Sequence, residues 1–135
     1  MPNTNQPLLV YVAGPYTPSN RDADIDTQMR EVEANVRRAV RAGEEVIRRG
    51  HVPFIPHTHT NSFAFRTVLP QSTELYYVWD RSILARCDVI YRYARSPGAD
   101  REWDWAKELG LIRVTTVDRL PRLEPWTKRL KEELD

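Results

Sequence analysis

A continuous apolar run near the start of the chain constrains the fold more than any other feature. Residues 8–13 read Leu-Leu-Val-Tyr-Val-Ala, and the pair Gly14-Pro15 ends the run. Apolar residues that follow one another without alternating polar positions indicate a strand buried on both faces, as in a parallel sheet. Parallel strands need long crossover connections, which are usually helices. The first strand therefore predicts an α/β domain.

The rest of the chain alternates as such a domain requires. We predict further strands over residues 51–55, 89–91 and 112–117, and helices over residues 29–49, 73–87, 97–109 and 124–134. This order predicts a parallel sheet of four to five strands with helices on both faces. Pro53 has no N–H for the ladder, so we expect the second strand at a sheet edge. Residues 15–28 and 56–72 are predicted to be irregular, and the second segment is long enough for a lid or binding loop.

The domain organisation follows from these elements. We expect residues 1–7 to be a loose tail, residues 8–120 to be one domain, and residues 121–135 to carry a C-terminal amphipathic helix. The apolar stripe of the first helix is predicted at Val32, Val36, Val40, Gly43 and Ile47, with Ala39 and Val46 beside it. The stripe of the last helix, Trp126, Leu130 and Leu134, would dock on its own domain or on a second subunit.

The composition excludes several classes of function. The chain has 135 residues, which is one domain by length, and a net charge of +1 argues against broad binding to a nucleic acid polymer or a membrane surface. Cys87 is the single cysteine and cannot form an intramolecular disulfide. No segment resembles a signal peptide, and residues 8–13 are too few to span a membrane. We therefore expect a protein of the reducing cytoplasm.

Glu102 is an acid on the apolar face of the helix predicted for residues 97–109. Trp105, Ala106 and Leu109 follow it at spacings of three, four and seven, so all four side chains share one face. A carboxylate directed inward must be paired, hydrogen-bonded or functional, because burying an unpaired charge is costly. Its place near the helix N-terminus is expected to keep it ionised, as a nucleophile requires. The alternative is a first-turn acid that only stabilises the helix dipole.

Asp80 repeats this anomaly in the helix predicted for residues 73–87. Ile83, Leu84 and Cys87 follow it at three, four and seven. Two inward acids, each in the first turns of a helix near the carboxyl edge of the sheet, form a candidate pair. Paired carboxylates serve glycosidic chemistry, one as nucleophile and one handling protons or holding the sugar. Alternatively, Asp80 is a helix cap or the partner of a buried arginine.

Other residue patterns point away from metals and cofactors. His57 and His59 lack a nearby third ligand, so we expect no metal. Gly14 stands alone, without the spacing of a dinucleotide fingerprint, and no phosphate-loop lysine motif is present, so we expect no cofactor. Tyr11 and Tyr16 flank the turn after the first strand, where Tyr16 would stack on a base or sugar or pack on the loop.

Four short motifs follow one another along the chain. They are the strand ending in Tyr11-Val12-Ala13-Gly14-Pro15-Tyr16, the segment Pro53-Phe54-Ile55-Pro56-His57, Asp80 eight residues before Asp88, and Ser96…Gly98-Ala99…Glu102…Ala106. Together they resemble the nucleoside 2-deoxyribosyltransferase superfamily, which includes the 2′-deoxynucleoside 5′-monophosphate N-glycosidases. The resemblance covers residues 8–117. It implies a Rossmann-like, flavodoxin-type sheet and a homodimer or higher homo-oligomer in which neighbours complete the pocket.

The resemblance also implies a reaction and a set of site residues. Glu102 would attack the anomeric carbon and expel the nucleobase, and Asp80 matches the acid that contacts the sugar and assists proton transfer. Water, or a second base, would then resolve the glycosyl-enzyme without any metal or organic cofactor. The substrate would be a nucleoside monophosphate or a nucleoside. Its binding residues would be Tyr11, Gly14, Pro15, Tyr16, His57, Ser96, Gly98 and Ala99.

The residue six positions before Glu102 indicates a branch of that superfamily. The transferases typically carry an aspartate there, which reads the base, whereas the nucleotide hydrolases carry a serine that binds the 5′-phosphate. Here the residue is Ser96, and hydroxyl and backbone N–H groups at a helix start suit a phosphate. Arg95 or Arg21 could add charge. We therefore predict an N-glycosidase that hydrolyses a nucleoside 5′-monophosphate.

Alternative functions stay open at this point. A deoxyribosyltransferase would need a second base, and a non-catalytic nucleotide-binding or scaffold domain would have little use for two inward acids. A phosphoribohydrolase of the cytokinin-activating type would need a stretch like Pro-Gly-Gly-x-Gly-Thr, which this chain lacks. Residues 97–101 also replace the glycine-richer turn of the characterised nucleotide hydrolases, and the Pro15-Tyr16 loop lacks their Ser-Ile-Arg-Gly-Gly-like phosphate loop.

Overall fold

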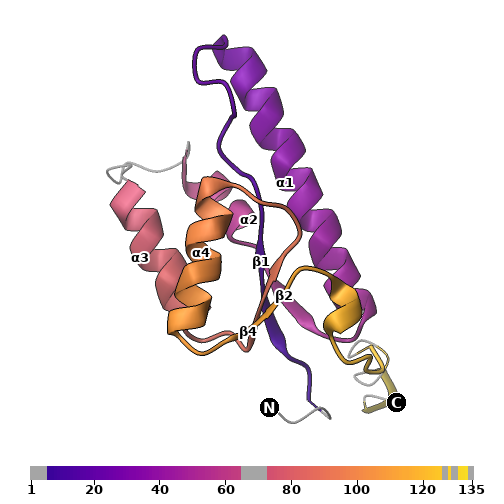
Figure 1. Ribbon diagram of the computed structural model, residues 1–135. Helices are drawn as coiled ribbons and strands as arrows, with labels where there is room; N and C mark the ends of the chain where they lie inside the picture. Colours follow the sequence, from indigo (N-terminus) through magenta and orange to yellow (C-terminus); the bar gives the residue numbers. More distant parts are fainter. Residues whose placement is uncertain (1–5, 65–72, 126–127, 129–130, 134–135) are drawn as a thin grey trace.

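A computed structural model of the chain describes residues 6–64, 73–125, 128 and 131–133, and its core is a parallel sheet (Figure 1). The strands are β1 (Leu9–Ala13), β2 (Val52–Phe54), β3 (Val89–Arg92) and β4 (Ile112–Val114). Within the described residues they form one four-stranded sheet of order β2-β1-β3-β4, and every neighbouring pair is parallel. The predicted α/β, Rossmann-like class is therefore confirmed.

The strand order creates a switch point at β1. The chain passes from β1 to β2 on one side of it and then crosses to β3 on the other side. At such a point the connections that follow the two central strands diverge and leave a crevice at their carboxyl ends. The strand containing Pro53 is at the sheet edge, as predicted, where its missing N–H removes no ladder bond.

Helices cover both faces of the sheet. They are α1 (Ile25–Arg48), α2 (Pro56–Ala64), α3 (Thr73–Leu84) and α4 (Pro97–Glu108). Along β1, Val10 and Val12 belong to the same core cluster as Val46 of α1. Tyr11 and Ala13 point to the opposite face, into a cluster with residues of α3 and α4. This two-sided burial is what the continuous apolar run predicts, and Figure 1 shows α1 on one side of the sheet and α3 with α4 on the other.

The first helix differs from its prediction in its start and in its buried face. It begins at Ile25, inside the predicted loop, because the Asp24 carboxylate caps it by accepting the Thr27 N–H at 2.8 Å. Its buried positions are Asn35, Ala39, Ala42, Gly43 and Val46. Ile47, predicted to be buried, is 37% exposed. Small residues allow this close packing, since a Cβ on Gly43 would lie 2.6 Å from the side chain of Ile55.

Other predicted boundaries also change. Residues 56–64 form helix α2 where an irregular loop was predicted, because Pro56 suits the first position of a helix. The strand predicted to reach residue 117 ends at Val114 and is followed by a 3-10 turn, Val117–Arg119. The remainder of the predicted loop, residues 65–72, lies outside the described residues.

The end of the domain is tied to the first helix. The Leu123 N–H donates to the carbonyl of Arg49 at 2.9 Å, so the chain just beyond residue 120 packs on the end of α1. The apolar stripe predicted for the last helix, Trp126, Leu130 and Leu134, lies outside the described residues, as do residues 1–5 of the predicted tail. Among the helices that are described, none is long and apolar enough to cross a membrane.

Candidate active site

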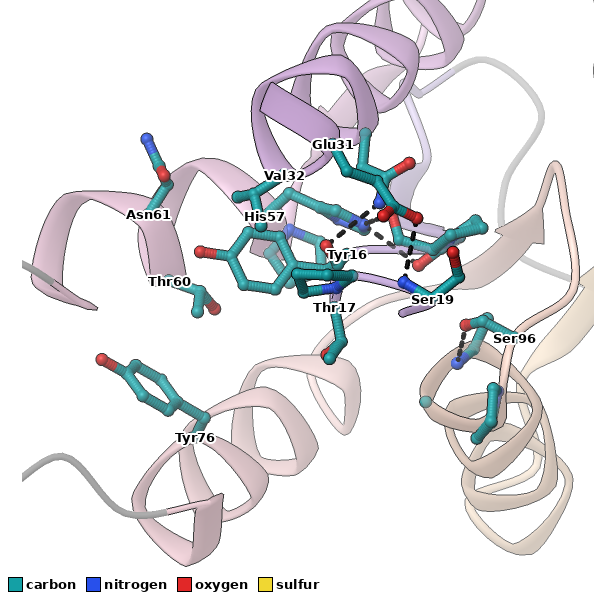
Figure 2. Close-up of a pocket in the computed structure, with 18 of the residues that line it drawn as sticks. Tyr16, Thr17, Ser19, Glu31, Val32, His57, Thr60, Asn61, Tyr76 and Ser96 are labelled. Carbon is teal, nitrogen blue, oxygen red and sulfur yellow. Dashed lines mark hydrogen bonds between the residues drawn. The ribbon is translucent and has the colours of Figure 1, made fainter. Parts of the chain in front are cut away.

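A cavity of about 1280 Å³ opens at the carboxyl edge of the sheet. Its walls come from the segments after β1 and β3 and from parts of all four helices. Figure 2 shows Tyr16, Ser96 and Tyr76 around this space, each supplied by a different segment. The cavity lies where the strand order places a crevice, and both predicted acids line it.

Glu102 occupies the second turn of α4 and is only 9% exposed. Its Oε2 accepts a hydrogen bond from the hydroxyl of Tyr11, which is fully buried on β1. The periodicity of α4 therefore correctly predicts an inward carboxylate. The alternative of a first-turn acid that only stabilises the helix dipole does not fit, because Glu102 lies in the second turn and is buried.

The protonation state of Glu102 differs from the expectation. The pKa of its carboxyl is raised from 4.5 to about 8, chiefly by burial. The Tyr11 hydrogen bond and the Arg101 charge lower this pKa, and the negative charge of Asp80 raises it. The sequence placed Glu102 where the helix N-terminus would keep it ionised. That expectation is wrong because desolvation outweighs the helix dipole for a side chain this deeply buried.

Asp80 lies in the interior of α3 and its Oδ1 is buried without a hydrogen-bond partner among the described residues. It is therefore not a helix cap. Burial raises the pKa of its carboxyl from 3.8 to about 7, and the positive charge of Arg101 opposes that rise. An unpartnered acid aimed into a cavity is a candidate for chemistry, since nothing else in the described fold uses that oxygen.

The two acids form an electrostatically coupled pair across α3 and α4. Asp80 acts on the pKa of Glu102, and Arg101 acts on the pKa of both. Because both pKa values are raised, the pair retains protons near neutral pH, and the two protons are lost in successive steps that belong to the pair. Such a pair can hold one carboxylate as a nucleophile while the other carboxyl keeps a proton to donate.

His57 holds the segment that follows β1. Its Nε2 lies 3.0 Å from the carbonyl oxygen of Gly14 and 2.8 Å from that of Pro15. Carbonyls only accept, so Nε2 carries the proton and donates to both. Burial lowers the pKa of His57, which keeps the ring neutral. The ring of Tyr16 packs edge-on against His57 at 5.5 Å, so α2 positions this whole wall of the cavity.

The glycine at the end of β1 serves packing. A Cβ on Gly14 would lie 2.1 Å from the Tyr93 ring, so any side chain there would displace that ring. The backbone of Gly14 nevertheless lines the cavity, as predicted for a binding residue. Tyr11 does not line the cavity and reaches the site through Glu102.

Ser96 is the N-cap of α4. Its Oγ accepts the Ala99 N–H at 3.0 Å, and its carbonyl accepts the Asp100 N–H at 2.8 Å. The hydroxyl proton is not used in that cap, so Ser96 can still donate to a ligand. Gly98 and Ala99 also line the cavity. The three predicted positions therefore lie together at one helix N-terminus, which favours anions.

Sequence reasoning missed several cavity residues. Arg101 places its guanidinium carbon 3.9 Å from the centre of the Tyr77 ring, and both residues line the cavity together with Trp105. Arg38 of α1 is another lining cation that the sequence analysis did not single out. The available signal was the spacing of four between Arg101 and Trp105 on one helix. That spacing was not used, although a helix was predicted for residues 97–109.

The two histidines of α2 lie in different surroundings. His59 packs among Phe54, Phe63 and Trp79 rather than beside His57. Within the described part of the chain, no three His, Cys, Asp or Glu side chains gather as a metal site would require. Arg21 and Arg95 line the cavity, and Arg95 pairs with Asp100 at 3.1 Å.

Comparison with known proteins gives one match. A family model described as Domain of unknown function (DUF7768) matches residues 8–116, which is most of the chain. No curated protein and no solved structure matches the chain.

Proposed function

We propose that this chain, which belongs to the DUF7768 family, is an N-glycosidase that hydrolyses the base–sugar bond of a nucleoside 5′-monophosphate. The observation that carries the proposal is the pair of acids in one cavity. Glu102 is buried and hydrogen-bonded to Tyr11, and Asp80 has an unpartnered oxygen beside the same space. Two carboxyl groups in different environments are what a retaining glycosidase uses.

In the first step the Glu102 carboxylate attacks the anomeric carbon of the sugar. A bond forms between that carbon and a Glu102 oxygen while the carbon–nitrogen bond to the base breaks. The electron pair of the broken bond passes to the glycosidic nitrogen of the base, and the base takes the proton of the Asp80 carboxyl. This leaves a glycosyl ester on Glu102 and a neutral free base.

In the second step water resolves the ester. The Asp80 carboxylate accepts a proton from water as the water oxygen attacks the anomeric carbon. The Glu102–carbon bond breaks with its electron pair returning to Glu102. Asp80 then holds the proton and Glu102 is a carboxylate, so the pair has returned to its starting state.

The electrostatics of the pair supply the proton that the reaction needs. The pKa of the Asp80 carboxyl is raised to about 7 and that of Glu102 to about 8, so the pair carries a proton in the neutral range. The Tyr11 hydroxyl stabilises the charged form of Glu102, because it donates to the carboxylate. The higher pKa places the resting proton on Glu102. The reaction proceeds from the other microstate, with the proton on Asp80, and the Tyr11 hydrogen bond makes that microstate more accessible.

The choice of a phosphorylated substrate rests on the wall around Ser96. Its hydroxyl proton is free of the helix cap, and Arg21, Arg38 and Arg95 line the same cavity. Phosphates are typically bound by arginines and by the N-terminus of a helix. The resemblance described above points the same way, because a serine at this position is typical of the nucleotide hydrolases.

Transfer of the sugar to a second base is the main alternative. The cavity of about 1280 Å³ exceeds the usual volume of a small-ligand site, which is roughly 300–1000 Å³. A second base therefore has room to enter once the first has left. Transfer and hydrolysis share the glycosyl-Glu102 ester and differ only in what resolves it.

The test is release of free base from a panel of nucleoside 5′-monophosphates and nucleosides, in ribose and deoxyribose forms, followed by chromatography. We expect release from a monophosphate, loss of at least a thousandfold in Glu102→Gln, and wild-type rates in Glu108→Gln. Glu108 is the matched control because it lies on the same helix, is exposed and pairs with Arg81 on the surface. Undiminished release in Glu102→Gln would overturn the mechanism. A new nucleoside formed when a second base is added would assign the protein to the transferases.

The proposal also includes where the enzyme acts and how it assembles. We place the protein in the cytoplasm, where nucleoside monophosphates occur and where Cys87 would stay reduced. We also expect a homodimer or higher homo-oligomer. Ile25 and Met29 of α1 line the cavity and are 66% and 45% exposed, which favours coverage of this wall by a neighbouring subunit. Light scattering of the purified chain tests the oligomer directly.

A further inference from the structure

Arg101 is a charged residue of the cavity wall to which the proposed reaction assigns no role. It precedes Glu102 on α4, and its guanidinium carbon lies 3.9 Å from the Tyr77 ring centre and 5.8 Å from that of Trp105. Its Nη2 lies near Gly98, 3.7 Å from where a Cβ on that glycine would stand, which is an ordinary contact distance. Arg101 therefore spans the gap from α4 to α3 at the wall of the cavity.

The guanidinium is held in place but its hydrogen-bonding capacity is unused. Among the described residues no carboxylate, carbonyl or hydroxyl accepts a hydrogen bond or ion pair from Arg101, although it is half-buried. Other arginines of the domain do have such partners: Arg92 and Arg95 pair with Asp100, and Arg81 with Glu108. Stacking on Tyr77 occupies a face of the guanidinium and leaves its in-plane N–H groups for a ligand.

The position of Arg101 indicates which part of the substrate it meets. Its charge lowers the pKa of both Asp80 and Glu102, so the guanidinium lies near both carboxyl groups. Tyr77, on which it stacks, precedes Asp80 by three residues on α3 and so lies on the same helix face. In a nucleotide the base and the phosphate extend from opposite ends of the sugar. The group beside the proton donor is therefore beside the departing base.

We propose that Arg101 binds the departing nucleobase through its in-plane N–H groups and selects 6-oxopurines. This inference rests on the proposed glycosidase function. Hypoxanthine and guanine present two neighbouring acceptors, O6 and N7, which a guanidinium binds with two parallel hydrogen bonds. Adenine places an amino donor at the same position, so a donor would face a donor.

Binding at this edge also assists bond cleavage. The electron pair of the breaking carbon–nitrogen bond passes to the base, and part of its charge reaches N7 and O6 until the Asp80 proton arrives. A guanidinium that already faces those atoms stabilises the charge as it develops. A bidentate arginine–purine pair typically discriminates by about tenfold to a hundredfold. The expected effect of Arg101 is therefore on the ratio of the rates at which two purine nucleotides are cleaved.

The experiment compares inosine and adenosine 5′-monophosphates, in ribose and deoxyribose forms, as the ratio of their kcat/KM values. We expect the wild type to favour inosine monophosphate by about tenfold or more. Arg101→Met should bring the kcat/KM ratio close to one. Arg101→Lys should also lose most of the preference, because an ammonium keeps the charge but lacks the two parallel N–H donors of the guanidinium. Arg81→Met is the matched control, because Arg81 also lies over Trp105, at 5.4 Å, but outside the cavity.

Two results would overturn the inference. One is a wild type that prefers adenine or a pyrimidine. The other is an Arg101→Met variant, shown to be folded by circular dichroism, that slows both purine nucleotides equally. A calorimetric comparison of the same two nucleotides on Glu102→Gln separates this inference from the reaction itself. If no base is released but this variant binds inosine monophosphate more tightly, and Arg101→Met abolishes the difference, the glycosidase proposal fails and the assignment of Arg101 stands.

Discussion

The burial of Glu102 predicts that a neutral side chain at this position stabilises the protein at alkaline pH. The folded pKa of the carboxyl is about 8, against an ordinary value of 4.5. A group whose pKa is raised by folding contributes stability that is fully present below its unfolded pKa and is lost as the pH rises through the folded value. The wild type should therefore lose stability between about pH 4.5 and pH 8 on account of Glu102, whereas Glu102→Gln should not.

The size of the effect follows from the pKa. At about 1.4 kcal/mol for each pKa unit, a rise from 4.5 to about 8 corresponds to about 5 kcal/mol. Glutamine keeps an oxygen that can accept the Tyr11 hydroxyl, so the hydrogen bond survives the substitution while the titration is removed. Domains of this size are stable by about 5–15 kcal/mol, so a change of this order is large.

Urea unfolding of both proteins at intervals from pH 4.5 to 9 measures the difference. Asp80 is present in both proteins, so subtracting one curve from the other leaves the Glu102 contribution together with its coupling to Asp80. We expect Glu102→Gln to gain about 3–5 kcal/mol relative to the wild type across this interval. Glu108→Gln, exposed on the same helix, should show a difference that hardly varies with pH. A Glu102→Gln difference that is equally flat would refute the argument.

Three further outcomes test the site. Tyr11→Phe removes the hydrogen bond that stabilises the Glu102 carboxylate, so the acidic limb of the kcat/KM profile should move up by about one to two pH units; an unmoved limb contradicts the role of Tyr11. Asp80→Asn removes the proton donor, so base release should fall by about a hundredfold or more and its alkaline limb should vanish; retention of that limb would assign it to another group. Gly14→Ala places a Cβ 2.1 Å from the Tyr93 ring, so unfolding free energy in urea should fall by about 1–3 kcal/mol; unchanged stability would mean that the ring moves without cost.

Periodicity and strand composition predicted the framework of the site well. The run over residues 8–13 is buried on both faces, and the strand with Pro53 lies at the edge. Glu102 faces inward because its helix position is set relative to its own apolar neighbours. These properties depend on residues within a few positions of one another, and local patterns report them.

Patterns were less informative where packing between elements decides the outcome. The predicted stripe of α1 included Gly43, with Ala39 and Val46 beside it, and these residues are buried. The stripe also contained Ile47, which is exposed, and it left out Asn35 and Ala42, which are buried. The helix lies close to the sheet, so small residues fit there better than Ile47. Residues 56–64 looked irregular because α2 has few apolar side chains to set a period, and contacts such as the His57 hydrogen bonds to β1 position it instead.

The sequence by itself determined that the chain forms a parallel α/β domain and that Glu102 points inward. Only the tertiary structure decided what Glu102 meets and whether it is charged. Tyr11, its hydrogen-bond partner, is 91 residues away in the chain, and Asp80 approaches from a different helix, α3. A pKa depends on desolvation and on nearby charges in space. Spacing along one helix therefore predicts which way a carboxyl group points, but not whether it carries a proton.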